Sequence, residues 1–444
     1  MRFRGLLAAV VVLAALGGAA WWSERKEKAS AGKPAADAPP KILSIPETDF
    51  QQIQLAKKAG GTTILKKADG KWQIVQPKPL AADQDSVNSL VTSLSSLSSD
   101  RLIEDKASDL SSYGLNSPAE QVAVTRKDGK VQTLLVGDDT PTGAGVFAKL
   151  ENDPRVFTIA SFVKSSLDKT SKDLRDKRLL TFNSDKLTRV VLTAKWATTE
   201  FGKNNQNEWQ ILKPRPLRAD GLQVDELVRK LKDAKMDTSG SDEDAKKAVA
   251  GFSTGLRVAV AAVTDVNGTQ QIEVRKDKDK NFYARSSAVE GIYKVTSDLG
   301  DGLDKGLDDF RNKKLFDFGW NDPSKLEVHN GATQATYQKN GEKWMSGPKQ
   351  MDAPSIQALV DKLRDLTSVK FLDTGNGPVL FEATVTANDG KRVEKVAIWK
   401  QGTSYYARRE GEPTVYQLDT KAVEDMQKAA NEIKEFQPPK SGKK

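Results

Sequence analysis

The apolar residues of this chain recur in one arrangement at three places. At each place five apolar residues stand at relative positions 0, 3, 4, 7 and 10, which lie on one face of an α-helix. This pattern predicts three amphipathic helices, each packed by its apolar face against a sheet. The residues are Val87, Leu90, Val91, Leu94 and Leu97, then Val224, Leu227, Val228, Leu231 and Ala234, then Ile356, Leu359, Val360, Leu363 and Leu366.

Shorter stretches around each helix alternate between apolar and polar residues, which is the period of a strand with one buried face. In the first copy Ile53 and Leu55 predict one strand, residues 62–65 a second and residues 71–75 a third. Asp69-Gly70 tolerates the positive φ of a tight hairpin turn. After the helices, the alternation predicts further strands at residues 122–125, 131–136, 257–263, 270–275, 381–386 and 392–398.

Each copy ends with two short strands and a second helix. The first of these strands carries an aromatic residue, then Ala and a basic residue, as in Phe147-Ala148-Lys149. The closing helices are predicted to end at Arg178-Leu179-Leu180, Lys314-Leu315-Phe316 and Lys434-Glu435-Phe436. The order of elements predicts the α+β class. We expect three tandem repeats, each a small antiparallel sheet with two helices, at residues 42–180, 181–316 and 317–436.

An uncharged run at residues 5–22 precedes the repeats. As a helix that rises about 1.5 Å per residue it would be about 27 Å long, marginally enough to cross a bilayer. We therefore predict an N-terminal transmembrane helix within residues 1–22; a cleaved signal peptide, with Gly18-Ala19-Ala20 as its small residues, is the alternative. Residues 23–41 are expected to form a disordered linker and residues 437–444 a basic tail.

The charges that flank this run do not decide its orientation. Arg25, Lys26 and Lys28 after the run outnumber Arg2 and Arg4 before it, which weakens the positive-inside argument. A single N-terminal span followed by a large domain is the usual geometry of export. We therefore expect a single-pass protein of the inner (cytoplasmic) membrane with the bulk of the chain outside the cytoplasm.

The composition argues against several classes of function. The formal charge is +9, but the basic residues are mixed with Asp and Glu, so we expect no binding to nucleic acid. Cysteine is absent, which excludes disulfides and thiolate chemistry. The single histidine, His329, leaves little material for a His-based triad or a usual zinc site. The alternation in Leu326-Glu327-Val328-His329 predicts an exposed imidazole.

A tryptophan and an aspartate recur at equivalent positions in every copy. A tryptophan can serve as a platform for a ligand, but recurrence in all copies favours an anchor in each core. Each aspartate precedes the first apolar helix position by four residues, where an N-cap lies. We therefore expect these side chains to build the fold. They are Trp72, Trp209, Trp344, Asp83, Asp220 and Asp352.

Three short motifs resemble functional sites without the partners that such sites need. Ser166-Leu167-Asp168-Lys169 has the Ser-x-x-Lys spacing of penicillin-recognising enzymes, but no Lys-Thr-Gly or Ser-Asp-Asn motif accompanies it. Gly143-Ala144-Gly145 lacks the third glycine of a dinucleotide fingerprint. The acidic loop at residues 138–142 could hold a cation, but it lacks the spacing of a calcium loop and is better explained as a solvated turn.

Five short motifs follow one another along the first repeat: Tyr113-Gly114-Leu115-Asn116-Ser117-Pro118, Leu135-Val136-Gly137, Phe147-Ala148-Lys149, Val156-Phe157-Thr158-Ile159 and Lys177-Arg178-Leu179-Leu180. In this order they resemble a bacterial family called domain of unknown function 4340, best over about residues 43 to 320. The resemblance implies a membrane-anchored envelope protein, often linked to ABC-type transporters of the kind related to gliding motility, with no established catalytic residues. The second repeat has Phe252-Ser253-Thr254-Gly255-Leu256 in place of the first motif, and the third keeps only Gly377-Pro378, so the loops of these repeats are expected to differ.

Two functional interpretations remain. The first is a membrane-anchored extracytoplasmic scaffold or accessory protein that is not catalytic, is held to the membrane by residues 5–22 and binds proteins of the envelope. The alternative is an envelope enzyme or a protein that binds a cell-wall polymer. Titratable groups that break the symmetry of the repeats in one copy would favour a site. Trp196, Trp320 and Arg408-Arg409 break it, but no acid/base set accompanies them, so we predict no catalytic, cofactor-binding or metal-binding residues.

Overall fold

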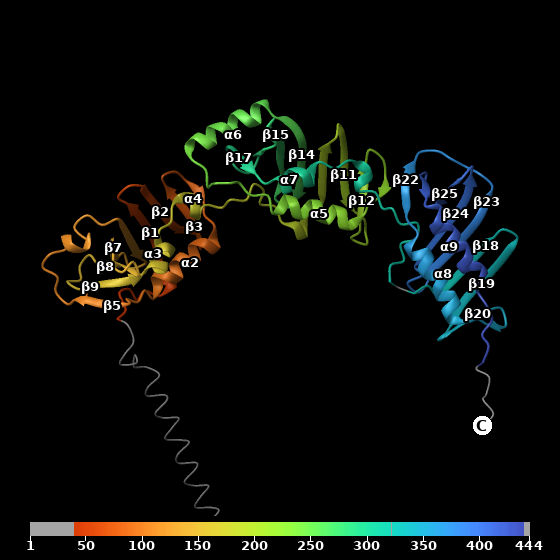
Figure 1. Ribbon diagram of the computed structural model, residues 1–444, viewed down its shortest axis with the longest axis horizontal. Coiled ribbons are helices and arrows are strands. Elements are labelled where there is room, and N and C mark those ends of the chain that lie inside the picture. The colour runs from red at the N-terminus through yellow and green to blue at the C-terminus, as the bar shows by residue number, and fades with distance from the viewer. Residues whose placement is uncertain (1–39, 321, 439–444) are drawn as a thin grey trace, which may run out of the picture. The chain divides into compact units, whose positions relative to one another are not determined.

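A computed structural model describes residues 40–320 and 322–438 of the chain (Figure 1). In this part of the chain the strands form three antiparallel sheets of nine, eight and nine strands, and helices pack on them, so the α+β prediction is confirmed. The predicted transmembrane helix, most of the predicted linker and all but two residues of the predicted tail lie outside the described residues. Within the described residues, no helix combines the length and the apolar character needed to span a bilayer.

The chain divides into two compact units. The first contains the first sheet, in residues up to 177 together with residues 237–241. The second contains the other two sheets, in residues 178–236 and from 242 onward.

The first sheet has the strand order β4-β3-β2-β1-β6-β7-β8-β9-β5. Helices α2, α3 and α4 accompany it. The elements are β1 (Phe50–Lys57), β2 (Gly61–Ala68), β3 (Lys71–Gln76), β4 (Leu80–Ala81), α2 (Gln84–Ser95), β5 (Arg101–Glu104), β6 (Glu120–Arg126), β7 (Val131–Asp139), β8 (Gly145–Leu150), β9 (Val156–Ala160), α3 (Ser161–Leu167) and α4 (Ser171–Leu174).

The second sheet has the order β13-β12-β11-β10-β14-β15-β16-β17. It repeats the order of the first sheet except at its last edge. The elements are β10 (Arg189–Ala194), β11 (Ala197–Lys203), β12 (Trp209–Lys213), β13 (Leu217–Arg218), α5 (Gly221–Lys232), α6 (Asp242–Thr254), β14 (Leu256–Asp265), β15 (Gly268–Lys276), β16 (Phe282–Ser286), β17 (Ile292–Val295) and α7 (Ser297–Leu303).

The third sheet has the order β21-β20-β19-β18-β23-β24-β25-β26-β22, which matches the first. Helices α8 and α9 lie together over it (Figure 1). The elements are β18 (Lys325–Asn330), β19 (Thr333–Asn340), β20 (Lys343–Ser346), β21 (Lys349–Gln350), α8 (Ala353–Asp365), β22 (Ser368–Leu372), β23 (Val379–Ala387), β24 (Arg392–Gln401), β25 (Ser404–Arg409), β26 (Val415–Leu418) and α9 (Thr420–Asn431).

All fifteen residues of the predicted helical pattern are buried, so the predicted helix face is confirmed. Helices α2, α5 and α8 supply the first four positions of each set. The fifth residue, Leu97, Ala234 or Leu366, follows the helix, and its carbonyl oxygen accepts a hydrogen bond from the backbone of the segment that opens the same sheet. The donors are the N–H groups of Ile42, Leu179 and Leu315, at 2.7, 2.8 and 3.0 Å.

These hydrogen bonds correct the prediction for the closing helices. Helices α3, α7 and α9 end at Leu167, Leu303 and Asn431, which is eleven, eleven and three residues before the predicted end segments begin. Arg178 instead forms a β-bridge with Lys235, and Lys314 forms one with Thr367. The segments could not continue a helix because their apolar side chains fill the core of the following sheet: Leu179 and Leu180 lie in the second core, and Leu315 and Phe316 in the third.

The second sheet differs from the other two at one edge. In the first and third sheets, β5 and β22 pair with β9 and β26. The corresponding stretch of the second repeat forms helix α6, so this repeat has more helices than predicted. Phe252 of α6 and Tyr283 of β16 are buried together in a small separate cluster. The expected departure of the second repeat near Phe252 therefore appears as an additional helix.

Candidate functional site

The three recurring tryptophans lie in the cores of the repeats. Trp72, Trp209 and Trp344 are 3%, 7% and 6% exposed, and each belongs to a different core. The indole N–H of Trp209 donates a hydrogen bond to Asp225 Oδ1 at 2.7 Å. The prediction that these tryptophans anchor the cores is confirmed.

The three recurring aspartates are N-caps, as predicted. Asp83, Asp220 and Asp352 each accept a hydrogen bond from the backbone N–H group three residues later, at 2.8, 3.2 and 3.1 Å. Each carboxylate thereby satisfies one of the N–H groups that the first turn of a helix leaves unpaired. Each carboxylate serves its own helix, α2, α5 or α8.

The short motifs of the sequence have structural roles. Ser166 donates its hydroxyl hydrogen bond to the carbonyl oxygen of Val163 within α3. In the acidic loop, Asp139 forms an ion pair with Lys164 at 2.8 Å. Among the described residues, no group of three or more His, Cys, Asp and Glu side chains is placed to hold a metal ion.

Three further residues that the sequence singled out are placed as follows. Trp196 and Trp320 are 98% and 89% exposed, so both indoles face solvent. His329 is partly buried, not exposed as predicted. It lies in β18 between β19 and β23, opposite Gln334 on one side and Glu382 on the other.

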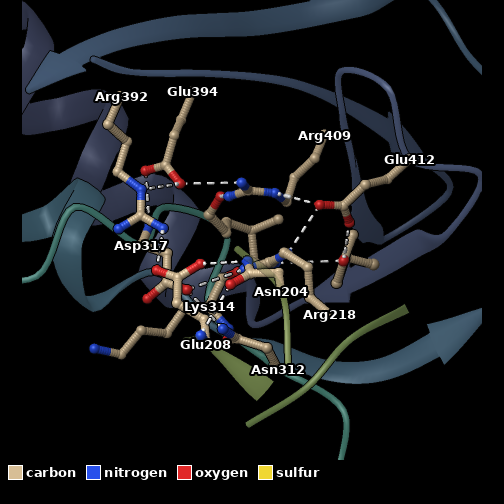
Figure 2. A network of polar contacts seen from close by, with 12 residues as sticks. Asn204, Glu208, Arg218, Asn312, Lys314, Asp317, Arg392, Glu394, Arg409 and Glu412 are labelled. Atoms are coloured by element: carbon tan, nitrogen blue, oxygen red, sulfur yellow. Dashed lines mark hydrogen bonds and ion pairs between the residues drawn. The ribbon is translucent and has the colours of Figure 1, made fainter. Parts of the chain in front are cut away.

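A network of charged side chains joins the second repeat to the third (Figure 2). Arg218 at the end of β13 places its Nε atom 2.8 Å from Oε1 of Glu412, in the loop between β25 and β26. The same carboxylate contacts Nε of Arg409 at 2.8 Å and accepts a hydrogen bond from the Tyr416 hydroxyl at 2.5 Å. Arg409 also contacts Glu394 at 3.0 Å. These groups form a continuous chain of opposite charges in which Glu394 and Arg409 are nearly fully buried.

The network also holds the backbone that connects the two sheets. Arg218 and Arg409 donate hydrogen bonds to the carbonyl oxygens of Lys314 and Leu315. The backbone N–H of Asp317 donates to Glu394 at 2.7 Å. The side chains therefore fix the connecting segment at Lys314, Leu315 and Asp317.

The second repeat holds its own opening segment at the same positions with neutral groups. Gln270 accepts a hydrogen bond from the Thr181 N–H at 2.8 Å, as Glu394 does from Asp317. Ser286 donates to the carbonyl oxygen of Leu179, as Arg409 does to that of Leu315. The third repeat thus has charged residues where the second has Gln and Ser, and one of them, Arg409, contacts the same Glu412 carboxylate as Arg218.

A pocket of about 190 Å³ lies beside this network. It is lined by Arg218 and Pro216 from the second repeat, by Arg311 and by Thr414 and Tyr416 from the third. The Arg311 guanidinium donates to Thr414 Oγ1 at 2.9 Å, and it lies 3.7 Å from the centre of the Phe371 ring. Both arginines are already held by protein groups.

The chemistry open to this pocket is limited. Burial is the main reason that the pKa of Tyr416 is raised above its ordinary value, so its hydroxyl stays protonated and donates to Glu412. The carboxylates of Glu394 and Glu412 are engaged by guanidinium groups. The geometry suits a structural junction, since every charged partner in it pairs with another side chain or with the backbone of this chain.

A second cluster of titratable groups lies in the first repeat. Glu120 at the start of β6 is 5% exposed, and its Oε1 atom has no hydrogen-bond partner. Its neighbour across the ladder is Lys57 of β1, which forms an ion pair with Asp168 at the end of α3. Burial, aided by the like charge of Asp168, raises the pKa of Glu120 to about 7, and Lys57 and Lys164 oppose this shift.

Sequence reasoning singled out Arg409 but missed Arg218, Glu412 and Glu120. Aligning the repeats residue by residue would have found them. Arg218 stands where the first repeat has Ala81 in the short strand after the tryptophan, because both pair with the residue that follows that tryptophan. The signal is a charged residue at a position where another repeat has a small apolar one. The period of the apolar residues does not show this difference.

Comparison with known proteins agrees with the internal repetition. The family model described as Domain of unknown function (DUF4340) matches residues 72–208 and 209–379, more than half of the chain. The two matches begin at Trp72 and Trp209, the residues that define the repeat. No curated protein and no solved structure matches the chain.

Proposed function

Because the chain belongs to this family of domains of unknown function, we propose that it is a membrane-anchored extracytoplasmic scaffold or accessory protein without a catalytic role. The observation that carries the proposal is the junction around Arg218 and Glu412. Its charged side chains hold one repeat against the next. A protein that presents surfaces to partners needs such a fixed relation between its repeats.

The recurring residues support the same proposal. The tryptophans fill cores and the aspartates cap helices, so the features shared by all repeats serve the fold. The apolar run at residues 5–22 is the proposed anchor, and the domains that follow it are proposed to lie outside the cytoplasm. We further propose that the partners are proteins of the envelope, and that they belong to an ABC-type transport complex related to gliding motility.

The anchor is tested by cell fractionation of the full chain and of residues 43–444. The full chain is expected in the membrane fraction and should need detergent for release. Residues 43–444 should be soluble, folded and monomeric, since each repeat has its own core. Insolubility or unfolding of the shortened chain would count against the proposed anchor.

The partners are tested by cross-linking in intact cells followed by co-purification of the full chain. We expect the membrane and ATPase subunits of an ABC-type transporter among the captured proteins. An Arg218→Ala variant should capture less, and Arg229→Ala, which removes an exposed arginine of α5 outside the network, should capture as much as the unmodified chain. Recovery of a cell-wall polymer instead of transporter subunits would support the polymer-binding alternative.

A further inference from the structure

The position of Glu120 is unusual when the paired residues of strands β1–β6, β10–β14 and β18–β23 are compared. In the first ladder the buried pair Leu55–Val122 is followed, two residues on, by Lys57 opposite Glu120. The corresponding pair in the second repeat is Ala194 opposite Ala259, and in the third Asn330 opposite Phe381. Ala259 and Phe381 are each 1% exposed. The first repeat therefore places a carboxyl group at a core position that is apolar in both other repeats.

The side chain of Glu120 points toward the helix-covered face of the sheet. It alternates with Gln121, which is exposed, and shares its face with the fully buried Val122 and Val124. Its other ladder neighbour, on β7, is Val136, which is also fully buried. A carboxylate in such surroundings is costly unless a cation pairs with it.

The charged groups that face Glu120 come from β1 and from the region of α3. They are Lys57, Lys164 and Asp168. Lys57 lies across the ladder, where opposite side chains have Cβ atoms about 5 Å apart. It is nevertheless paired with Asp168, which is 53% exposed, and Lys164 is paired with Asp139. The cation opposite the buried carboxyl group in the ladder is thus engaged by a carboxylate at the protein surface.

We propose that Glu120, Lys57 and Asp168 form a proton-linked latch, in which loss of the proton from Glu120 draws Lys57 away from Asp168 and releases the end of α3. With Glu120 protonated, Lys57 holds Asp168, the residue at which α3 ends. When the proton leaves to solvent, the buried carboxylate lacks a partner and competes for the same ammonium group. The exposed Asp168 loses less by release, because water solvates its charge.

The raised pKa of Glu120, about 7, agrees with this geometry because it puts the exchange near neutral pH. The latch goes beyond the proposed scaffold function, since it would let proton concentration control a surface segment of the first repeat.

The test is hydrogen exchange of the full chain, measured by mass spectrometry between about pH 5.5 and about pH 8.5 and corrected for the intrinsic effect of pH. Backbone amides of residues 164–169 should gain exchange in a step with a midpoint near pH 7. Helix α7 of the same chain is the matched internal control, because its repeat has Ala259 and Ala194 in place of Glu120 and Lys57. Its amides should show no step.

Three variants separate a latch from local instability. Glu120→Gln, which keeps the shape and fixes the group as neutral, should abolish the step. Asp168→Asn removes the partner that Lys57 holds, so the amides of residues 164–169 should exchange quickly at both pH values and show no step. It also removes a like charge and frees Lys57, so the titration of Glu120 itself should move to lower pH by about half a unit or more. Lys57→Met removes the favourable cation, so the titration of Glu120, followed by NMR of its carboxyl carbon, should move to higher pH. A step that persists in Glu120→Gln, or shifts of the same sign in the other two variants, would overturn the proposal.

Discussion

The Nε atom of Arg218 lies 2.8 Å from the Oε1 atom of Glu412, and this contact connects the second repeat to the third. Neither charge belongs to the pattern that the repeats share. Ala81 takes the place of Arg218 in the first repeat. Glu412 precedes the Tyr416 of β26 by four residues, and Val289 precedes the corresponding Tyr293 of β17 by four. The junction therefore arose where individual repeats diverged from the common sequence.

Replacing Leu227 by Asp is expected to unfold the second repeat. Leu227 is 1% exposed on the inner face of α5, and a carboxylate there would be buried without a partner, at a cost of about 4 kcal/mol or more. Leu222→Asp on the same helix is the control, because Leu222 is 80% exposed and its replacement should change stability by less than about 0.5 kcal/mol. Equal thermal unfolding of the two variants would refute the assignment of the helix face.

Replacing the helix cap Asp220 by Ala should lower the free energy of unfolding of the second repeat by about 1 kcal/mol. The carboxylate of Asp220 accepts the hydrogen bond from Gln223 N–H, and alanine leaves that group without a side-chain acceptor. Asp220→Ser retains an acceptor and should recover most of the loss in chemical denaturation. If serine and alanine destabilise the repeat equally, the cap does not act as described.

The stability of the first repeat is expected to fall as the pH rises from about 4.5 to about 7. Burial raises the pKa of Glu120 from 4.5 in its ordinary state to about 7 in the folded chain, so the folded state binds the proton more tightly. Stability is therefore highest when Glu120 is protonated, and the loss amounts to about 3 kcal/mol once the carboxyl group is ionised.

Calorimetric scans at pH values on both sides of this range measure the effect. Glu120→Gln should remove this contribution to the pH dependence, and Glu226→Gln, at an exposed position in α5 of the second unit, should leave the transition of the first repeat unchanged. A first repeat that is equally stable at both pH values would show that Glu120 is not held as a buried acid.

The period of the apolar residues predicted most of the fold. It placed the helices α2, α5 and α8 and the main strands, because the period of a helix or a strand determines which of its residues share one face. It could not place Leu179 and Leu180 correctly. Two adjacent apolar residues after a basic pair fit the end of a helix as well as the start of an extended segment, and only the core that receives them decides.

The junction could not be predicted from the sequence for a related reason. Arg218 and Glu412 are separated by more than a whole repeat, and nothing in either local pattern indicates that they meet. Helix α6 was also missed, since its apolar residues Ala248 and Phe252 pack on the face of the sheet opposite the main core. Such features depend on contacts between distant segments and produce no periodic pattern in the sequence.

The most direct test of this account is a double-mutant cycle at Arg218 and Glu412, followed by differential scanning calorimetry of residues 43–444. If the divergent charges join the second and third repeats into one body, the unmodified chain should show these repeats unfolding in one transition. Arg218→Ala and Glu412→Ala should each split it, with a coupling energy of about 1 to 2 kcal/mol between the two sites. Separate transitions for the two repeats in the unmodified chain, or additive effects of the two substitutions, would contradict the account.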